Sequence, residues 1–401
     1  RMDLDFQPSP AEENPGLLIR DCLHFSDTSL LIPGYLLRFL PYFDGCHTRE
    51  QLVEAITRAA NRETALGLAA HLCETLDSAG FLECESYWNR RDAVIEEFRR
   101  APVRHAAHAG SAYPDTEAEI RAYFDSNLRP GSFARDVGGD GMIGIAAPHI
   151  SFEGGWNSYS SMAAALSKAA PDSLFVVMGT SHYGERDRFG LTAKPFETPL
   201  GRTRSEPSLV EKLAAAAPDA TIVEDYCHAV DHSLEFHVLL LQHLVRPDVR
   251  VLPILVGGFG SAMQAGTTPE ADPATAKLFS ALREFAREEG RKLFWLLSVD
   301  MAHMGKRYGD DFEAQVSTGR MAQVEETDRA RVEMLAAGDA SAFWDDVAKR
   351  DAELKWCGSS TLYTFTQVYP EARARLLHYE QWNIDPASVV SFGTVAFTGT
   401  E

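Results

Sequence analysis

The sequence predicts an α/β protein with a mainly parallel sheet flanked by helices, preceded by a small domain. The chain has 401 residues, more than one typical domain, and 45% of them are hydrophobic, which suffices for a sizeable core. After about residue 100, short apolar runs alternate with helical patterns. Strands separated by helices are typical of a parallel sheet covered on both faces. We therefore expect two domains, residues 1–98 and residues 99–401.

The first domain is expected to begin with a loosely ordered stretch, followed by two helices. Residues 1–15 are polar and contain prolines. Thr48-Arg49-Glu50-Gln51 has the pattern of a capping box, in which the threonine hydroxyl and the glutamine amide satisfy free backbone donors of the first turn. The box predicts a helix through about Ala60. Leucines spaced along residues 64–78 predict a second helix, which stops at Gly80.

The end of this domain suggests a winged helix, because Phe81-Leu82-Glu83-Cys84 is predicted to form the first strand of a wing. The stretch from Leu40-Pro41-Tyr42-Phe43-Asp44-Gly45 through Thr48 to Gly80-Phe81-Leu82 resembles the small winged-helix peptide-chaperone domains related to PqqD. Residues 1–100 hold 10 Lys and Arg against 17 Asp and Glu, a net charge of −7 that repels DNA. We therefore expect a protein or peptide partner for this domain, or a purely structural role.

Composition argues against several classes of partner. The formal net charge of −20 disfavours a surface that binds nucleic acid, since such binding depends on Lys and Arg. No window approaches the roughly 20 apolar residues that span a bilayer, and no signal-peptide pattern opens the chain. The six cysteines include no C-x-x-C pair, and the four in the first hundred residues are expected to be reduced thiols. We expect a cytoplasmic protein that binds neither nucleic acid nor membrane.

The second domain shows the alternation of strands and helices most clearly. A charged segment, Asn89 to Arg100, is expected to form a helix that leads into it. The strand candidates are Met142–Ala147, Leu174–Met178, Val251–Val256, Leu293–Leu297 and Val389–Phe397. The helix candidates are Asn157–Ala169, Ser208–Ala216, Leu234–Val245, Pro273–Glu288 and Asp328–Ala337. In an open parallel sheet, ligands collect beyond the carboxyl ends of the strands.

Polar residues suited to metal binding follow three of these strands. His149 comes after the first strand and His182 after the second, while Asp300 and His303 follow the fourth. Neutral imidazoles bind iron, copper or zinc, and a thiolate adds a soft donor. Cys357, in Trp356-Cys357-Gly358, is the cysteine of the large domain that best fits this role. One crevice at the strand ends is therefore expected to hold these side chains.

A further histidine, His232, lies in the stretch Asp231-His232-Ser233-Leu234-Glu235 and is expected in the same crevice. Asp231 and Glu235 are candidates for orienting His232 or a metal-binding imidazole. His237 is interpreted as a residue that packs its helix or supports the site from behind. The remaining histidines of this domain that we interpret as structural are His105, His228, His243 and His378.

The order of motifs in the large domain resembles the Memo family, including bacterial members encoded as the AmmeMemoRadiSam system protein B. The resemblance extends from about Arg104 to Phe397. Each motif is short, but the motifs occur along this chain in the same order as in the family. The matching stretches are His108-Ala109-Gly110-Ser111-Ala112-Tyr113-Pro114, Ala147-Pro148-His149, Met178-Gly179-Thr180-Ser181-His182, Thr198-Pro199-Leu200-Gly201, Asp231-His232-Ser233-Leu234-Glu235-Phe236-His237, Leu252-Pro253-Ile254-Leu255-Val256-Gly257, Ser298-Val299-Asp300-Met301-Ala302-His303 and Cys357-Gly358.

The resemblance implies a metal site. The Memo family is similar in fold to class III extradiol dioxygenases, which hold non-haem Fe(II) at strand ends. When the resemblance is carried over residue by residue, it implies that the metal ligands are His149, His182 and Cys357. It also implies that His303 is the acid/base residue, with Asp300 and His232 beside it. A cysteine thus stands where the dioxygenases have a carboxylate, and a thiolate suits both Fe(II) and copper.

The chain departs from the family directly after His149. Memo proteins usually continue with Ala-Gly-Tyr and a small Ser-Gly turn, whereas Ile150-Ser151-Phe152-Glu153-Gly154-Gly155-Trp156 follows here. Phe152, Glu153 and Trp156 are therefore expected to reshape the pocket or to supply a further carboxylate. For this reason the substrate is not carried over from the family.

The sequence favours a non-haem oxidoreductase that uses Fe(II), or alternatively copper, to oxidise a small organic molecule with O₂. Two alternatives stay open. The first is a binding module whose crevice recognises a peptide or protein without catalysis. The second is a hydrolase in which Cys357 is the nucleophile and His303 is the base. The partners expected are a small molecule or peptide in the crevice and a protein or peptide on the winged-helix domain.

Overall fold

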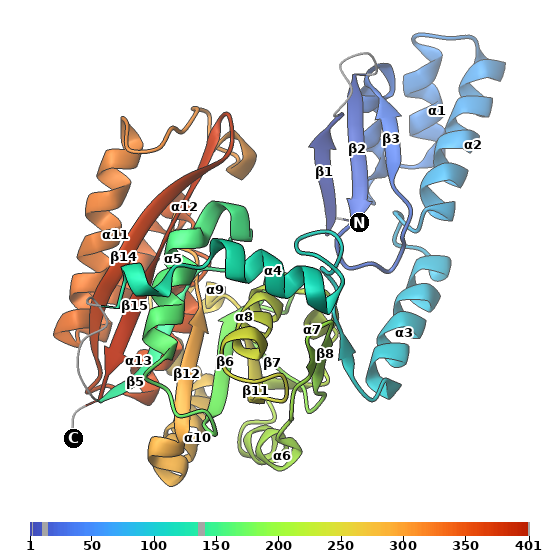
Figure 1. Ribbon diagram of the computed structural model, residues 1–401. Coiled ribbons are helices and arrows are strands. Elements are labelled where there is room, and N and C mark those ends of the chain that lie inside the picture. The colour runs from blue at the N-terminus through green and yellow to red at the C-terminus, as the bar shows by residue number, and fades with distance from the viewer. Residues whose placement is uncertain (2, 10–14, 135–140, 400–401) are drawn as a thin grey trace. The chain divides into compact units, whose positions relative to one another are not determined.

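Contacts within the chain divide it into two units, Arg1–Ala101 and Pro102–Glu401 (Figure 1). The structure is a computed structural model, and it describes all residues except 2, 10–14, 135–140 and 400–401. The described part of the chain contains no helix long and apolar enough to cross a membrane. Each unit has its own hydrophobic core.

The first unit packs a three-stranded antiparallel sheet on a group of helices. Its elements are β1 (Leu4–Pro8), β2 (Gly16–Asp21), β3 (Leu30–Pro33), η1 (Gly34–Phe43), α1 (Arg49–Thr57), α2 (Arg62–Ser78) and α3 (Glu85–Arg100). The predicted capping box is confirmed, because Thr48 Oγ1 accepts a hydrogen bond from the Gln51 backbone N–H and Gln51 Oε1 accepts one from the Thr48 N–H. The two predicted helices, α1 and α2, both form close to the expected places.

Two predictions about the first unit are wrong. Residues 81–84 form no strand, because Phe81 is buried in the core and Cys84 already serves as the N-cap of α3. Residues 4–8 were expected to be loosely ordered, yet they pair with β2, where Phe6 lies opposite Ile19. The strands of this unit thus precede its helices. Pairing with β2 explains the order of residues 4–8, and the local sequence pattern does not reveal that pairing.

The second unit contains a nine-stranded sheet whose centre is parallel, which confirms the predicted fold class. The four central strands run in the order β11 (Arg250–Val256), β6 (Leu174–Thr180), β12 (Leu293–Ser298) and β5 (Met142–Ala147). The outer strands are β10 (Thr221–Val223), β7 (Phe189–Leu191), β15 (Ser388–Thr398), β14 (Arg373–Asp385) and β13 (His303–Gly305). β7 and β15 run antiparallel to their central neighbours. All five predicted strands are present.

Helices cover both faces of this sheet (Figure 1). Alternate residues of β6 enter different cores, with Val176 on one side and Val177 on the other. One face packs against α4 (Glu117–Asn127), α5 (Phe152–Leu166) and α8 (His232–Leu244). The other face packs against α6 (Pro207–Ala216), α9 (Gly260–Ala265), α10 (Pro273–Glu289), α11 (Arg320–Ala337), α12 (Ala340–Leu354) and α13 (Ser359–Val368). Smaller elements are β4 (Arg104–His105), β8 (Phe196–Thr198), β9 (Gly201–Arg202), α7 (Cys227–Val230), η2 (Pro130–Ser132), η3 (Pro269–Ala271), η4 (Gly290–Lys292) and η5 (Lys306–Tyr308).

All five helices predicted for the second unit are present in the expected order, as α5, α6, α8, α10 and α11, and all but α10 begin earlier than predicted. The helix predicted from Asn157 begins five residues earlier, at Phe152, and includes Gly154 and Gly155. Gly155 has a non-helical backbone, and the helix is kinked there. No signal for α4, α7, α9, α12, α13 or β14 was recognised in the sequence. Because α12 and α13 flank Cys357, the surroundings of that residue were the least well predicted.

A buried ion pair anchors the start of the second unit to α8. Arg104 and Glu235 are 1% and 0% exposed, and their side chains form a salt bridge. The Glu235 carboxylate also accepts hydrogen bonds from the Tyr113 hydroxyl and from the backbone N–H groups of Ala107 and His108. Burying two charges is costly unless each is fully hydrogen-bonded, and this network meets that condition.

We expect Glu235→Gln to lower the free energy of unfolding by about 3–5 kcal/mol, because it leaves the buried Arg104 charge without a counter-ion. Urea unfolding of the whole chain measures the change. The control is Glu197→Gln, which removes a partner of Arg202 at a largely exposed ion pair. That change is expected to cost no more than about 1 kcal/mol. Equal effects of the two substitutions would contradict this account of the network.

Candidate metal centre

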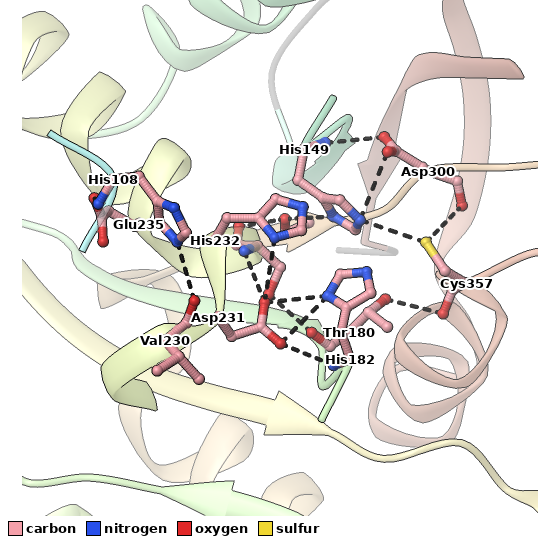
Figure 2. Close-up of polar contacts among 12 residues, drawn as sticks. His108, His149, Thr180, His182, Val230, Asp231, His232, Glu235, Asp300 and Cys357 are labelled. Carbon is pink, nitrogen blue, oxygen red and sulfur yellow. Dashed lines mark hydrogen bonds and ion pairs between the residues drawn. The ribbon is translucent and has the colours of Figure 1, made fainter. Parts of the chain in front are cut away.

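Four of the predicted site residues lie beyond the carboxyl ends of central strands, as expected. His149 follows β5, His182 follows β6, and Asp300 follows β12. His303 is the first residue of β13, a few residues further on. Parallel strands deliver these side chains to one edge of the sheet. Figure 2 shows His149, His182 and His232 gathered there, with Asp300 and Cys357 on one side.

Two site residues come from helices instead of strand ends, which corrects the sequence interpretation. His232 is the first residue of α8, and its predecessor Asp231 is the N-cap. Cys357 lies in the turn between α12 and α13. The apolar residues before them belong to helices α7 and α12 and form no strand. Both side chains nonetheless lie beside His149 at this edge of the sheet.

Three imidazoles form the core of the site. One ligand nitrogen from each of His149, His182 and His232 can be chosen so that all three lie within 4.8 Å of one another. The rings of His182 and His232 are stacked, with centroids 4.8 Å apart, and the His149 ring stands nearly perpendicular to both. Nitrogens converging from three segments of the chain are suited to a single metal ion.

Cys357 joins this cluster through His149. The Cys357 Sγ lies 3.4 Å from His149 Nε2 and 3.6 Å from the backbone oxygen of Asp300. Nitrogen and sulfur donors bound to one tetrahedral ion at 2.0–2.3 Å lie roughly 3.5 Å apart. The separation of Sγ and Nε2 therefore fits a shared ion. Burial raises the pKa of the Cys357 thiol, and the neighbouring His182 opposes that shift.

A chain of hydrogen bonds fixes which nitrogen of His149 is free. Ser298 Oγ donates to the backbone oxygen of Ser233 at 2.5 Å, so its single proton is already used. Because the same Oγ lies 3.0 Å from His149 Nδ1, it must accept a hydrogen bond from that nitrogen. The proton of His149 thus sits on Nδ1. Nε2 keeps its lone pair and faces Cys357.

Asp231 orients His182. Its carboxylate oxygens lie 3.2 and 3.3 Å from His182 Nδ1, and they also accept hydrogen bonds from the backbone N–H groups of His182 and Ser233. Burial disfavours charge on both partners, but their attraction outweighs it, so the pKa of Asp231 is well below its usual value and that of His182 well above. A carboxylate on one imidazole nitrogen is the usual support for a metal ligand through the other.

The other two imidazoles of the cluster are neutral. Burial, followed by the nearby His182, lowers the pKa of His232 to about 3. Burial also holds the pKa of His149 well below its usual value. Metal ions bind imidazole only in its unprotonated form. Both residues are therefore held in the state that ligation requires.

His303 lies outside the cluster of three histidines. Its Nδ1 is 3.0 Å from the backbone oxygens of both Met301 and Lys355, so this nitrogen must carry the proton. The unprotonated Nε2 is then available to accept a proton, although burial lowers the pKa of His303 to about 4. The ring packs edge-on against Tyr308, with centroids 4.9 Å apart.

Asp300 combines a structural contact with a place beside the cluster. Its Oδ1 accepts a hydrogen bond from the His149 backbone N–H at 2.9 Å, and Oδ2 lies 3.6 Å from His149 Nε2. Burial raises the pKa of Asp300 to about 7. A carboxyl group that titrates near neutral pH beside a metal site is suited to holding a proton.

The structure also decides the lesser sequence expectations. Asp231 orients an imidazole, as one interpretation held, but Glu235 contacts none of the cluster and serves the Arg104 network instead. His237 Nε2 donates to the backbone oxygen of Pro148, which supports the segment carrying His149 from behind. Glu153 adds no donor to the cluster, because its carboxylate accepts a hydrogen bond from the Tyr123 hydroxyl.

Two supporting residues escaped the sequence analysis. Ser298 sets the protonation of His149, and the Thr180 hydroxyl donates to the backbone oxygen of Cys357 at 2.9 Å. Both are the last residues of central strands. A hydroxyl residue at the carboxyl end of a strand, just before a candidate ligand, is the signal that would have found them.

Comparison with known proteins agrees with the motifs. A MEMO1 family protein of Aquifex aeolicus is 23% identical over 384 residues, covering 95% of each chain. A MEMO1 family protein of Thermus thermophilus is 27% identical over 274 residues, covering 68% of this chain and 75% of its own. A MEMO1 family protein of Archaeoglobus fulgidus is 25% identical, and the match covers 74% of this chain and 99% of that protein. The model of the Memo-like protein family matches residues 104–396, and the chain therefore belongs to that family.

Proposed function

We propose that this chain is a metal-dependent oxidoreductase in which His149, His182 and Cys357 hold one Fe(II) ion and a small organic molecule is oxidised by O₂. The observation that carries the proposal is the approach of Cys357 Sγ to His149 Nε2 at 3.4 Å. The proton of His149 is held on the opposite nitrogen, so both atoms of this contact are available as donors once the thiol ionises.

The donor set favours a redox-active ion. Two neutral imidazoles and a thiolate suit iron and also copper, whereas magnesium and calcium prefer oxygen donors. When bound, such an ion supplies coordination positions at which O₂ and a substrate meet. His232 lies against His182 and is a fourth imidazole donor within reach. We assign His232 to the neighbourhood of the ion, because the resemblance gives the third ligand position to Cys357, whose Sγ lies 3.4 Å from His149 Nε2.

His303 and Asp300 supply the proton chemistry in this proposal. His303 keeps Nε2 unprotonated at neutral pH and accepts a proton there, while its Nδ1 stays fixed by two carbonyl oxygens. Asp300 carries a carboxyl group whose pKa burial raises to about 7, so it holds or releases a proton beside His149. A positioned acid or base of this kind contributes typically about 10²–10⁴-fold to a rate.

A hydrolase is a second candidate, because a thiol beside an imidazole is also the arrangement of a nucleophile and its base. The thiol contacts His149, whereas the sequence interpretation paired it with His303. Burial raises the pKa of the Cys357 thiol, which disfavours the reactive thiolate when no ion is bound. Alkylation of Cys357 with iodoacetamide separates the two candidates, because a bound ion protects the thiol.

We expect the protein, purified without oxygen, to contain about one equivalent of iron, and Cys357→Ser or His182→Ala to lose most of it because each removes a ligand. Elemental analysis measures the content. The controls are Cys73→Ser and His105→Ala, which change a cysteine of the first unit and an exposed histidine. Full iron content in the Cys357→Ser protein would contradict the proposed ligand set.

We expect Asp231→Asn to weaken metal binding by about 10–100-fold, because an asparagine no longer provides the charge that orients His182. Competition with a chelator of known affinity measures the change. The control is Asp225→Asn, which alters another buried carboxylate, one that accepts a hydrogen bond from the Cys227 N–H. An affinity equal to that of the unchanged protein would show that Asp231 does not support the ligand.

We expect His303→Gln to keep its metal but to lose about 10²–10⁴-fold in substrate-dependent O₂ consumption, because the glutamine amide does not accept a proton. Candidate phenols and thiols serve as substrates, and an oxygen electrode records the uptake. Unchanged uptake would remove His303 from the mechanism. Peptide binding by a metal-free Cys357→Ala protein, with no O₂ uptake by the unchanged protein, would favour a binding module instead.

A further inference from the structure

The turn that carries Cys357 is held in place by its neighbour Trp356. Trp356 is 3% exposed and sits in the core between α11 and α12. On the other side of Cys357, Gly358 packs so closely on Val299 that an added Cβ would lie 2.0 Å from Val299 Cγ1. Lys355, at the start of the turn, has a positive φ of 51°. The position of the thiol thus depends on how this turn is clamped.

A fully buried carboxylate on α11, that of Asp328, clamps the tryptophan. Asp328 is 0% exposed, and its Oδ1 accepts a hydrogen bond from Trp356 Nε1 at 2.7 Å. Its Oδ2 accepts hydrogen bonds from the Ser391 hydroxyl at 2.6 Å and from the Tyr379 hydroxyl at 2.9 Å. Each oxygen faces donors, so the surroundings are shaped for an ionised carboxylate. The function proposed above makes no use of this group.

The same carboxylate reaches the segment of His303. The Ser391 hydroxyl that donates to Asp328 also accepts a hydrogen bond from the Ala302 N–H at 2.9 Å. Ala302 directly precedes His303, whose Nδ1 in turn donates to the backbone oxygen of Lys355. Asp328 therefore connects the turn of Cys357 with the strand of His303 through one intermediate residue on each side.

A second residue of α11 strengthens the grip on the tryptophan. The Arg331 guanidinium lies over the Trp356 ring, 4.9 Å from the centroid, and Arg331 Nε donates to Asp346 of α12 at 2.7 Å. Asp328 and Arg331 are three residues apart, so they share one face of the helix. One face of α11 thus holds both the ring and the N–H of Trp356.

We propose that Asp328 is a positioning residue for the metal centre: it sets the Cys357 thiol and the His303 imidazole in fixed relation by holding Trp356 and, through Ser391, Ala302. This inference rests on the proposed function, in which the Cys357 thiol binds a metal ion. An ordinary core network would contribute to stability alone. If the network positions the thiol, its disruption must also change the accessibility of the thiol and its bond to a metal.

The test uses the whole chain with Asp328→Asn and, separately, Trp356→Phe, which removes the N–H and leaves a smaller aromatic ring. In metal-free protein we expect iodoacetamide to label Cys357 at least about 10-fold faster in both variants, because the turn opens more often. Mass spectrometry of the Cys357 peptide gives the rate. Trp356→Phe provides the answer if Asp328→Asn does not fold.

The second readout is the binding of Co(II), whose charge-transfer absorption reports a bound thiolate. We expect both variants to bind Co(II) about 10–100-fold more weakly, with a weaker charge-transfer absorption per bound ion. The matched control is Glu235→Gln, a buried carboxylate on the opposite face of the sheet with a similar number of donors. It is expected to lower stability while leaving the labelling rate of Cys357 and the Co(II) spectrum unchanged.

Labelling rates and Co(II) spectra in Asp328→Asn and Trp356→Phe that match the unchanged protein would overturn the inference. So would a Glu235→Gln protein that shows the same changes as they do. If the unchanged protein binds no Co(II), the proposed function fails, and the labelling rates alone then decide whether Asp328 positions the turn. The two failures are therefore distinguishable.

Discussion

The site depends on one constraint: three of its imidazoles each give one nitrogen to a fixed hydrogen bond and direct the other away from that partner. Ser298 imposes this on His149, Asp231 on His182, and two backbone oxygens on His303. Without these partners a buried imidazole is free to exchange the positions of its proton and its lone pair, and the direction of its donor atom is lost. Preparation of the ligands is thus built into the strand ends and the start of α8.

The sheet accounts for how this arrangement is reached from distant parts of the chain. β5, β6 and β12 are neighbours and parallel, so the residues after them lie close together although they are far apart in sequence. These strands were predictable because they are mostly buried and consist of continuous apolar runs. The histidines that follow them were predictable for the same reason. The parallel centre of the sheet therefore explains why the sequence identified this part of the site.

The local structure around the rest of the site was less predictable. Cys357 and His232 were expected at the site, but the apolar residues before them belong to helices and form no strand, which their local pattern did not distinguish. Ser298 and Asp328 act through contacts to segments more than 25 residues away, such as Trp356 from Asp328, and a single sequence does not reveal these pairings. The wing predicted at residues 81–84 is absent, because this short segment leads directly into α3, whose N-cap is Cys84.

The relatives differ in how much of this chain they match. The Aquifex aeolicus protein matches 95% of the chain, whereas the Archaeoglobus fulgidus protein matches 74% of it. Every residue of the proposed metal centre lies in the large unit, Pro102–Glu401. A peptide or protein partner for the small unit stays a prediction.

The central claim is that one ion is shared by two imidazoles and the thiol of Cys357. Diffraction from crystals of the iron-loaded protein, recorded on both sides of the iron absorption edge, tests it most directly. The account predicts a single anomalous peak about 2.0–2.3 Å from His149 Nε2, a nitrogen of His182 and Cys357 Sγ. A peak bound by His149, His182 and His232 with the thiol turned away, or no peak at this edge of the sheet, would contradict it.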